Sequence, residues 1–380
     1  MRRMMMGLVL LCGLRGEAAA QSSVFDPRAL GIPQPPLSAR AVGMSGSVGQ
    51  LDGLSGTNPA AITSVIGLTV GFNFFQDWRS STTPGGTGSG SDAGMPYVTV
   101  VNRIKETPYY LSGSFGSYTD RDFGFVTTDS TIVDGALVGY RDSLESRGGT
   151  SDVRLAIGYR NGKKVAIGFG LHFITGSNRF SLFRTFTDTA FTSVRQRSEL
   201  AYNAIGFSLG AVYHPREPLL LTAVVRHDGT MNVDRDSLQA YTFTLPWTFA
   251  GSAQYQMGRR GTLNAELSYT TWSAADDELV ANGGVGADNV FSASLGAEIP
   301  TSALNPAKLP LRVGMRTRQL PFPLSAGQQP TEFSVSAGSG GRFAKGHAAF
   351  DLALQRLWRK SDGGFSEDAW ILTVGLTLKP

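Results

Sequence analysis

One short stretch of the sequence has the pattern of a hydrolase nucleophile. Residues 206–210 read Gly-Phe-Ser-Leu-Gly, which matches the G-x-S-x-G motif. In hydrolases that serine stands on a sharp turn between a strand and a helix, whereas Ser208 lies within an unbroken alternation of large and small residues. We therefore expect an ordinary strand here, without a catalytic serine.

Other residues that often carry chemistry are scattered. Residues 85–94 (GGTGSGSDAG) are as glycine-rich as a phosphate-binding loop, but no lysine closes them and no helix is expected to follow. The histidines have no spacing typical of metal ligands; they are His172, His214, His227 and His347. The sequence thus predicts no enzyme, no metal site and no cofactor.

Charged side chains recur within segments that alternate in polarity. Glu266, Arg312, Arg316, Asp351 and Arg154 fall on the side of the alternation that otherwise carries small residues. They could form an ionic ladder between neighbouring strands. Alternatively, Arg154, Arg312 or Arg316 could bind the carboxylate of a ligand through a bidentate pair. The residue pattern leaves both interpretations open.

The segments that hold these residues alternate with a period of two, which is typical of β-strands. Residues 153–159, 165–173, 205–213 and 370–378 place large apolar side chains on one side and mostly Gly, Ala, Ser or Thr on the other. A soluble sandwich would carry charged residues on its second side. Small residues suit the interior of a closed barrel whose apolar exterior meets lipid. Only 17% of the residues are charged, which agrees with this.

The chain begins like an exported protein. Two arginines precede an apolar stretch (residues 4–14), and small residues lead to Ala20, so residues 1–20 are expected to be a cleaved signal peptide. Cys12 is the only cysteine and would leave with it, so the exported chain should contain no disulfide. With a formal net charge of +4, nucleic acid is not an expected partner.

Residues 66–380 are expected to form an all-β, transmembrane, antiparallel barrel of about 14 strands. Short connectors such as 161–164 alternate with long ones such as 119–149, as periplasmic turns and extracellular loops do. Trp78, Trp272, Trp358 and Trp370 fall at the loop ends and are expected to form an aromatic girdle. The expected strands are 66–78, 95–104, 109–119, 150–160, 164–184, 195–213, 219–232, 240–256, 262–274, 289–299, 309–318, 331–339, 347–358 and 368–379.

The segment between the signal peptide and the first strand, residues 21–65, carries two motifs. Residues 39–47 read Ala-Arg-Ala-Val-Gly-Met-Ser-Gly-Ser, and residues 58–60 read Asn-Pro-Ala. This pair resembles the amino-terminal hatch of the FadL-like outer-membrane transporters of hydrophobic compounds and of their PorV-like relatives. Two departures are Ser45, where the family has glycine, and the final Pro380, where barrel-assembly signals usually end in an aromatic residue.

The resemblance implies that residues 21–65 form a hatch, or plug, inside the barrel. Asn58 is expected to pin the backbone by hydrogen bonds, and Arg40 to anchor the hatch to a barrel carboxylate such as Glu266. The residues that match the hatch motif are Arg40, Gly43, Asn58, Pro59 and Ala60.

The resemblance also implies a function in the bacterial outer membrane. A monomer would take up hydrophobic small molecules, such as long-chain fatty acids, and release them through a lateral opening at a kink in the third strand. In that strand the alternation of Tyr109, Leu111, Gly113 and Phe115 fails at residues 116–118, beginning with Gly116, as at a β-bulge. Gly113 and Gly116 are the candidate kink residues. The implied partners are the ligand, the lipid bilayer with its lipopolysaccharide, and the barrel-assembly machinery.

A second function remains open. A PorV-like protein would serve as a binding or scaffold component of a secretion system without passing a small molecule. Apolar loop segments at 189–191 and 320–324 fit either a ligand-collecting rim or a docking surface.

Overall fold

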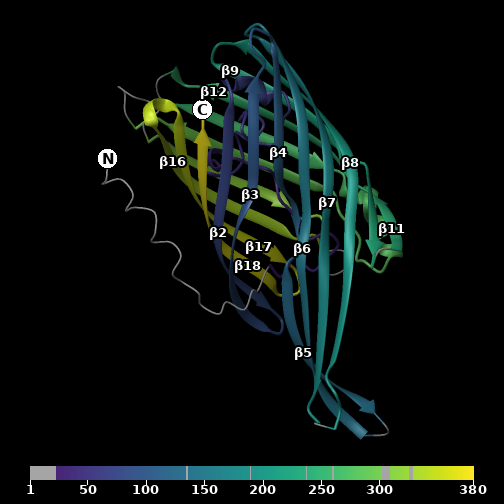
Figure 1. Ribbon diagram of the computed structural model, residues 1–380. Helices are drawn as coiled ribbons and strands as arrows, with labels where there is room; N and C mark the ends of the chain where they lie inside the picture. Colours follow the sequence, from purple (N-terminus) through teal and green to yellow (C-terminus); the bar gives the residue numbers. More distant parts are fainter. Residues whose placement is uncertain are drawn as a thin grey trace, which may run out of the picture.

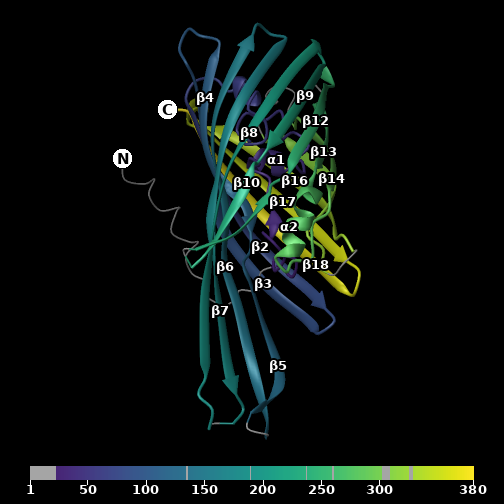
Figure 2. The same cartoon turned by 90° about the vertical axis from the view of Figure 1, so that its right-hand side faces the viewer.

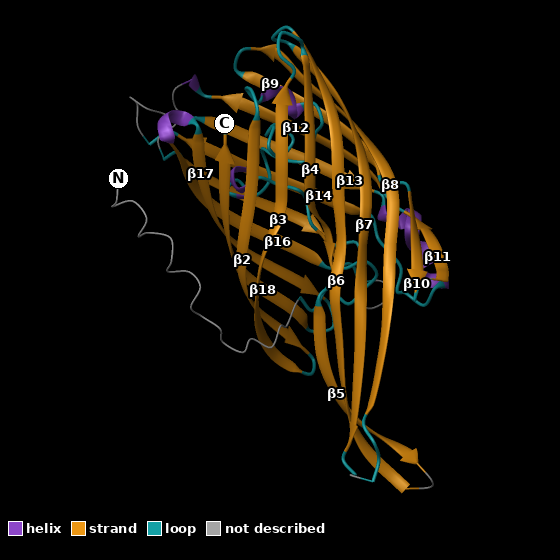
Figure 3. Cartoon of the chain, viewed as in Figure 1, coloured by secondary structure: helices purple, strands orange, loops and turns teal. Residues whose placement is uncertain are grey.

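The computed structural model describes residues 23–380 except 134–135, 189, 237, 259–260, 302–308 and 325–327, so the expected signal peptide lies outside the described residues. Strands dominate the chain (Figure 3). Fourteen of them pair in sequence and β18 pairs with β2, which closes an antiparallel barrel and confirms the expected fold. The barrel strands are β2 (Thr69–Thr83), β3 (Gly86–Arg103), β4 (Tyr109–Asp120), β6 (Ala136–Asn161), β7 (Val165–Phe186), β8 (Val194–Arg216), β9 (Leu219–His227), β12 (Trp247–Gln256), β13 (Thr262–Thr270), β14 (Val290–Ile299), β15 (Leu311–Gln319), β16 (Thr331–Phe343), β17 (Ala348–Ser361) and β18 (Phe365–Leu378).

The alternation along each strand separates the two faces of the wall as expected. On β7, Ile167, Phe169 and Leu171 are exposed on the outside, whereas Ala166 and His172 are buried. The outer surface is therefore apolar, and small or polar side chains face the interior.

The two ends of the barrel differ in the length of their connectors. We name them the turn end, with short connectors such as 104–108 and 162–164, and the loop end, with long connectors such as 271–289. At the loop end β5 and the adjoining parts of β6 and β7 extend as an arm beyond the barrel (Figure 1). None of the described helices is long and apolar enough to cross a membrane. The remaining elements are β1 (Ile32–Pro33), β5 (Phe123–Val133), β10 (Thr230–Arg235), β11 (Leu238–Thr244), α1 (Ala39–Val42), α2 (Asp276–Ala281), η1 (Ala61–Ser64), η3 (Trp272–Ala275) and η4 (Ala344–Gly346).

Several expected boundaries were wrong. The connector expected at 119–149 contains β5 and the first half of β6, which form a hairpin. The strand expected at 219–232 is interrupted by Gly229, whose φ of 77° suits a turn, and the strand expected at 240–256 is interrupted by Pro246, which has no N–H for the ladder.

The expected tryptophan girdle is also only partly correct. Trp78 and Trp370 are adjacent, exposed partners on β2 and β18. Trp272 instead is buried in η3 and packs edge-on against Phe322, with 5.0 Å between ring centroids, because the chain turns inward after β13.

Residues 23–65, which we name the leading segment, occupy the interior of the barrel. Helix α1 packs against β16, β17 and β18, while η1 packs against β4, β6, β7 and β8 on the other side (Figure 2). Between these contacts nearly every residue from 41 to 63 is buried. The segment therefore crosses the interior from one wall to the other.

Candidate functional site

Interior glycines form two contact areas for the leading segment. On one side, a Cβ added at Gly314 would lie 2.3 Å from the carbonyl carbon of Met44, and one added at Gly296 would lie 2.3 Å from Ser47 Oγ. On the other side, a Cβ at Gly168 would lie 2.4 Å from the backbone of Pro59. Any side chain at these positions would overlap the segment, so the glycine faces are shaped to hold it.

The two hatch motifs lie at these contact areas. Gly43 approaches Gly338: a Cβ added at Gly43 would be 3.3 Å from the Gly338 Cα. Asn58 is fully buried beside Gly210; its Nδ2 donates to the Gln50 carbonyl at 2.8 Å, and its Oδ1 accepts the N–H of Ala60 at 2.9 Å. The side chain thus holds two turns of the segment together.

Ser45 stands where the resembling hatches have glycine. Its φ of 52° explains why glycine suits the position, because few other residues adopt that backbone conformation readily. The Ser45 hydroxyl lies 2.8 Å from the hydroxyl of Ser336 on β16, so the substitution adds a hydrogen bond to the wall.

Arg40 pairs with a barrel carboxylate as expected, but the partner is not Glu266, the residue given as the example. Arg40 pairs with Glu298, with both its Nε and its Nη2 3.1 Å from the Glu298 carboxylate oxygens. Glu298 is one residue from the turn end of β14, where α1 directs the arginine, whereas Glu266 lies in the middle of β13. Glu266 contacts the leading segment by accepting the N–H of Gln50 at 3.3 Å.

The three candidate arginines differ in their partners. Arg312 pairs with Glu298 at 2.7 Å and with Asp351 at 2.5 Å, and Arg316 pairs with Glu332 at 3.1 Å, so both belong to ionic ladders. Arg154 is fully buried and donates from Nη1 to the Gly56 carbonyl at 2.6 Å. Its Nε and Nη2, which together form one edge of the guanidinium, have no partner among the described residues.

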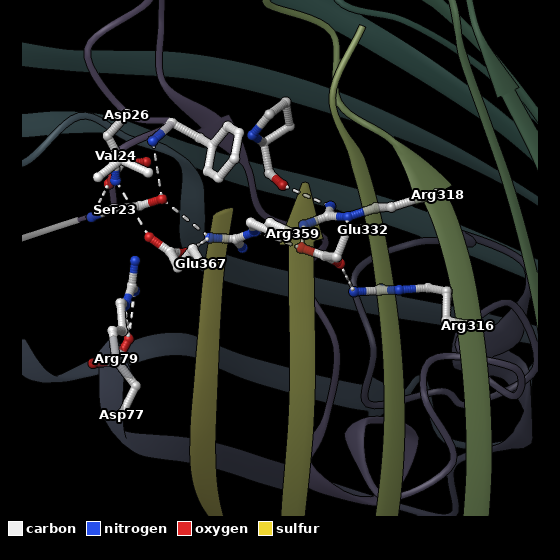
Figure 4. A network of polar contacts seen from close by, with 12 residues as sticks. Ser23, Val24, Asp26, Asp77, Arg79, Arg316, Arg318, Glu332, Arg359 and Glu367 are labelled. Atoms are coloured by element: carbon white, nitrogen blue, oxygen red, sulfur yellow. Dashed lines mark hydrogen bonds and ion pairs between the residues drawn. The ribbon is translucent and has the colours of Figure 1, made fainter. Parts of the chain in front are cut away.

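A second ionic network holds the start of the leading segment at the loop end (Figure 4). Glu332 accepts from Arg318 and Arg359, at 2.7 and 2.8 Å, and Arg359 also pairs with Glu367 at 2.6 Å. The segment joins this network where Glu367 accepts the N–H of Val24 at 3.2 Å. Sequence analysis missed these residues, although Arg318 continues the alternation set by Arg312 and Arg316.

The wall has an incomplete seam between β3 and β4. Their pairing begins at the turn end and stops at Tyr97 and Gly116, because the next residue of β3 is Pro96, which has no N–H to donate. Beyond that point β4 bulges between Ser117 and Thr119, and the β2–β3 hairpin diverges from β4 and β5 (Figure 1). The break expected around Gly116 therefore coincides with a parting of two strands.

The leading segment covers this seam. Ile32 and Pro33 pair with Asp120 and Thr119, and the N–H of Gln34 donates to the Tyr118 carbonyl at 2.8 Å. The close approach requires Gly31, where an added Cβ would lie 1.8 Å from the Asp120 oxygen and where φ is 83°. Short β1 therefore supplies backbone partners that β3 cannot.

Two cavities lie on the loop-end side of the segment. The first, which we name the mouth pocket, has a volume of about 580 Å³; it combines apolar groups such as Phe180 and Leu279 with four arginines, and Asp236 is the only acidic residue that lines it. The second, the seam cavity, has a volume of about 130 Å³ and is lined by Pro33, Tyr97 and Ser117 at the seam. The arginines of the mouth pocket are Arg28, Arg121, Arg197 and Arg235.

Ser208 has partners that sequence analysis did not foresee. Its hydroxyl lies 2.9 Å from His172 Nε2, and His172 Nδ1 lies 2.8 Å from the carboxylate of Asp152, which is the order of a hydrolase triad. Ser208 and His172 are each 1% exposed, and Ser208 lies within the continuous strand β8 rather than on the strand-to-helix turn that presents a hydrolase nucleophile. The three side chains instead tie β6, β7 and β8 together.

No group of His, Cys, Asp and Glu among the described residues is arranged to hold a metal ion.

Comparison with solved structures shows which proteins share this fold. The chain is similar to a FadL homologue from Pseudomonas aeruginosa, at 12% identity over 92% of this chain and 99% of that chain, with a TM-score of 0.63. It is also similar to the toluene transporters TodX from Pseudomonas putida (13% identity, 93% and 100% coverage, TM-score 0.60) and TbuX from Ralstonia pickettii (13%, 91% and 98%, 0.60).

These similarities confirm the resemblance to FadL-like barrels at the level of the fold. The neighbours are described as transporters or channels rather than enzymes. No protein-family model and no curated protein matches the sequence.

The glycine contacts give a first prediction. Gly314→Ala should loosen the leading segment, because the added methyl group overpacks against the Met44 backbone. Such overpacking costs roughly 2 kcal/mol, which lowers the equilibrium constant for docking of the segment about thirtyfold. Ion conductance through single barrels in planar bilayers should rise. Gly251→Ala is the control, since the nearest atom to its new Cβ would be 3.5 Å away. Equal conductance in both variants would contradict the assigned contact.

A second prediction concerns Asp26, which is buried and accepts the N–H of Ser23 at 3.0 Å. Burial, with a smaller effect from Asp120, raises the pKa of Asp26 well above its usual value. The protonated form is therefore favoured when the segment is docked, so docking is stabilised at low pH and weakens as pH rises through that raised pKa. Hydrogen exchange of residues 23–37 should accelerate with pH more in the wild type than in Asp26→Asn, after correction for intrinsic exchange. Identical corrected profiles would exclude this role.

Proposed function

We propose that the protein transports hydrophobic small molecules across the outer membrane, with residues 21–65 acting as a hatch after removal of residues 1–20. In this orientation the loop end faces the cell exterior and the turn end faces the periplasm. The observation that carries the proposal is the seam between β3 and β4, which is closed by the leading segment rather than by a barrel strand. A ligand that displaced β1 would find an opening from the interior to the bilayer.

The proposed path begins at the mouth pocket. Its volume of about 580 Å³ lies in the range of ligand sites. Phe180 and Leu279 offer an apolar surface, and Arg121 has its guanidinium 5.1 Å from the centroid of the Phe180 ring. This combination favours a ligand with an apolar body and a negatively charged group over a neutral hydrocarbon.

The path continues to the seam cavity. Pro33 both lines this cavity and pairs with β4, so a ligand that fills the cavity presses against the residue that closes the seam. The Pro33 carbonyl also accepts from Arg318 Nη1 at 3.1 Å, which connects the closure to the ionic network around Glu332. Movement of a short strand is sufficient to open this route, while the glycine contacts keep the rest of the hatch in place.

Arg154 is the best candidate for binding a ligand carboxylate. It lies opposite Ser114 on β4, two residues before the seam opens at Gly116. The unpartnered Nε and Nη2 form the edge that binds a carboxylate in bidentate fashion, and the Tyr97 hydroxyl, also unpartnered, belongs to the residue paired with Gly116. Arg312 and Arg316 already have carboxylate partners and are less suited to the role.

The seam can be tested with a reversible lock. Pro33 and Thr119 are paired residues, whose Cα atoms in an antiparallel ladder lie about 4.5–5.5 Å apart, within disulfide range. A Pro33→Cys/Thr119→Cys variant should lose about 90% of its fatty-acid uptake into proteoliposomes when oxidised, because β1 cannot move. Reduction should restore uptake.

A matched pair distinguishes locking from the presence of a disulfide. Ala253→Cys/Ala265→Cys joins β12 and β13, whose pairing is complete, and should leave uptake unchanged in both redox states. Each single-cysteine variant should also transport normally. Full uptake by the oxidised Pro33–Thr119 variant would rule out the seam as the exit.

Arg154→Gln tests the ligand class. Loss of a charge-assisted hydrogen bond should weaken binding of a long-chain fatty acid roughly tenfold, while binding of toluene should change by less than about twofold. Isothermal titration of the detergent-solubilised barrel measures both. Arg316→Gln, which removes a paired arginine, should not discriminate between the two ligands. Equal weakening of both ligands by Arg154→Gln would assign the residue a structural role only.

A further inference from the structure

Charged residues segregate between the two ends of the barrel. The turn end carries nine cationic residues and only two acidic ones, Glu106 and Glu217. This count covers four connectors with their flanking strand residues, and the residue after β18. The four segments are 102–110, 160–166, 215–219 and 342–349. The described loop-end connectors, counted without flanking strand residues, contain Arg121 and Arg235 among a large majority of Asp and Glu, whereas the adjoining strand ends also carry cations such as Arg195 and Lys360. The nine cations, which we name the turn-end rim, are Arg103, Lys105, Arg160, Lys163, Lys164, Arg216, Arg342, Lys345 and Lys379.

The rim cations have no carboxylate partner in the described part of the chain, although Arg103 donates to the Thr107 carbonyl at 3.2 Å and Arg160 to the Thr63 hydroxyl at 3.4 Å. None forms an ion pair with a described residue, whereas the interior arginines Arg312, Arg316 and Arg359 all do. Seven of the nine are exposed, and Lys163 and Lys164 stand side by side at the tip of their turn. Neighbouring like charges repel one another, so a negatively charged partner would stabilise the rim.

The rim also lies at a defined depth. Exposed aromatic side chains stand within a few residues of its cations: Tyr109, Tyr213 and Phe343 face outward, where aromatic residues of membrane proteins meet the lipid headgroups. The turns are short, so their cations stay close to that level. They are placed to reach lipid phosphates rather than a partner deep in the periplasm.

We propose that the turn-end rim binds anionic phospholipid headgroups of the adjoining leaflet. Clustered Lys and Arg next to an apolar membrane surface recognise such headgroups through their charge, with little demand on geometry. The preference for anionic over zwitterionic lipid requires only that the barrel spans the membrane, and is independent of what passes through it.

The test compares lipids retained by the full chain. Protein in neutral detergent is mixed with equal amounts of phosphatidylglycerol and phosphatidylcholine, and native mass spectrometry counts the lipids that remain bound. The wild type should retain about five times more phosphatidylglycerol than phosphatidylcholine, and Lys105→Gln/Lys163→Gln/Lys164→Gln should reduce this ratio below about two. The control, Arg141→Gln/Arg195→Gln/Lys360→Gln, removes three exposed cations toward the loop end and should keep the wild-type ratio.

Three outcomes would overturn the proposal. The wild type could bind both lipids equally, the rim variant could keep its preference for phosphatidylglycerol, or the control could lose that preference.

A separate experiment places each protein in nanodiscs of phosphatidylcholine and adds a fluorescent polyglutamate peptide. Peptide binding that depends on the rim, together with equal lipid retention, would instead assign the surface to an acidic protein. Heat-dependent migration of each variant in gels confirms that its barrel is folded.

Discussion

Backbone hydrogen bonding within the wall is the constraint on which the rest of this structure depends. In hydrocarbon no water is present to satisfy an exposed N–H or C=O, so a barrel must pair every strand edge with another strand. Most seams satisfy this rule with neighbouring barrel strands, and β10 continues the pairing of β8 beyond the end of β9. At the β3–β4 seam Pro96 ends the ladder, and the chain completes it with Gln34 and its neighbours from inside.

The same constraint explains the composition of the interior. A segment of more than forty residues can lie against the wall only where side chains are absent, which accounts for glycines such as Gly168, Gly210 and Gly314 on the inner face. Elsewhere the inner face is polar, and its buried charges occur in networks such as Glu332 with Arg318 and Arg359, because an unpaired buried charge is strongly destabilising. Arg154 departs from this rule, since two of its donors are buried without a partner among the residues that the structure describes.

Much of the barrel was predictable from sequence, because the alternation of large apolar residues with small or polar ones indicates which side of a strand meets lipid. Fourteen strands and their order follow from it, and the Asn-Pro-Ala motif located a major contact of the leading segment. Pairings that depend on three-dimensional placement were not predictable. Arg40 meets Glu298 rather than Glu266 because of the direction of α1, and Trp272 is buried because the chain turns inward after β13.

The seam also favours the proposed transport over a scaffold role. A barrel that only presents a docking surface is best served by a continuous wall, since each unpaired backbone group reduces its stability in lipid. Here the wall is interrupted beside a cavity, and the interruption is covered by a two-residue strand that also contacts that cavity. A cover of this length contributes few hydrogen bonds and can be displaced at small energetic cost, whereas the glycine contacts that hold the remaining segment are extensive. The leading segment thus combines extensive glycine contacts with a short closure at the seam, an arrangement that fits the proposed passage of a molecule better than the binding of a partner.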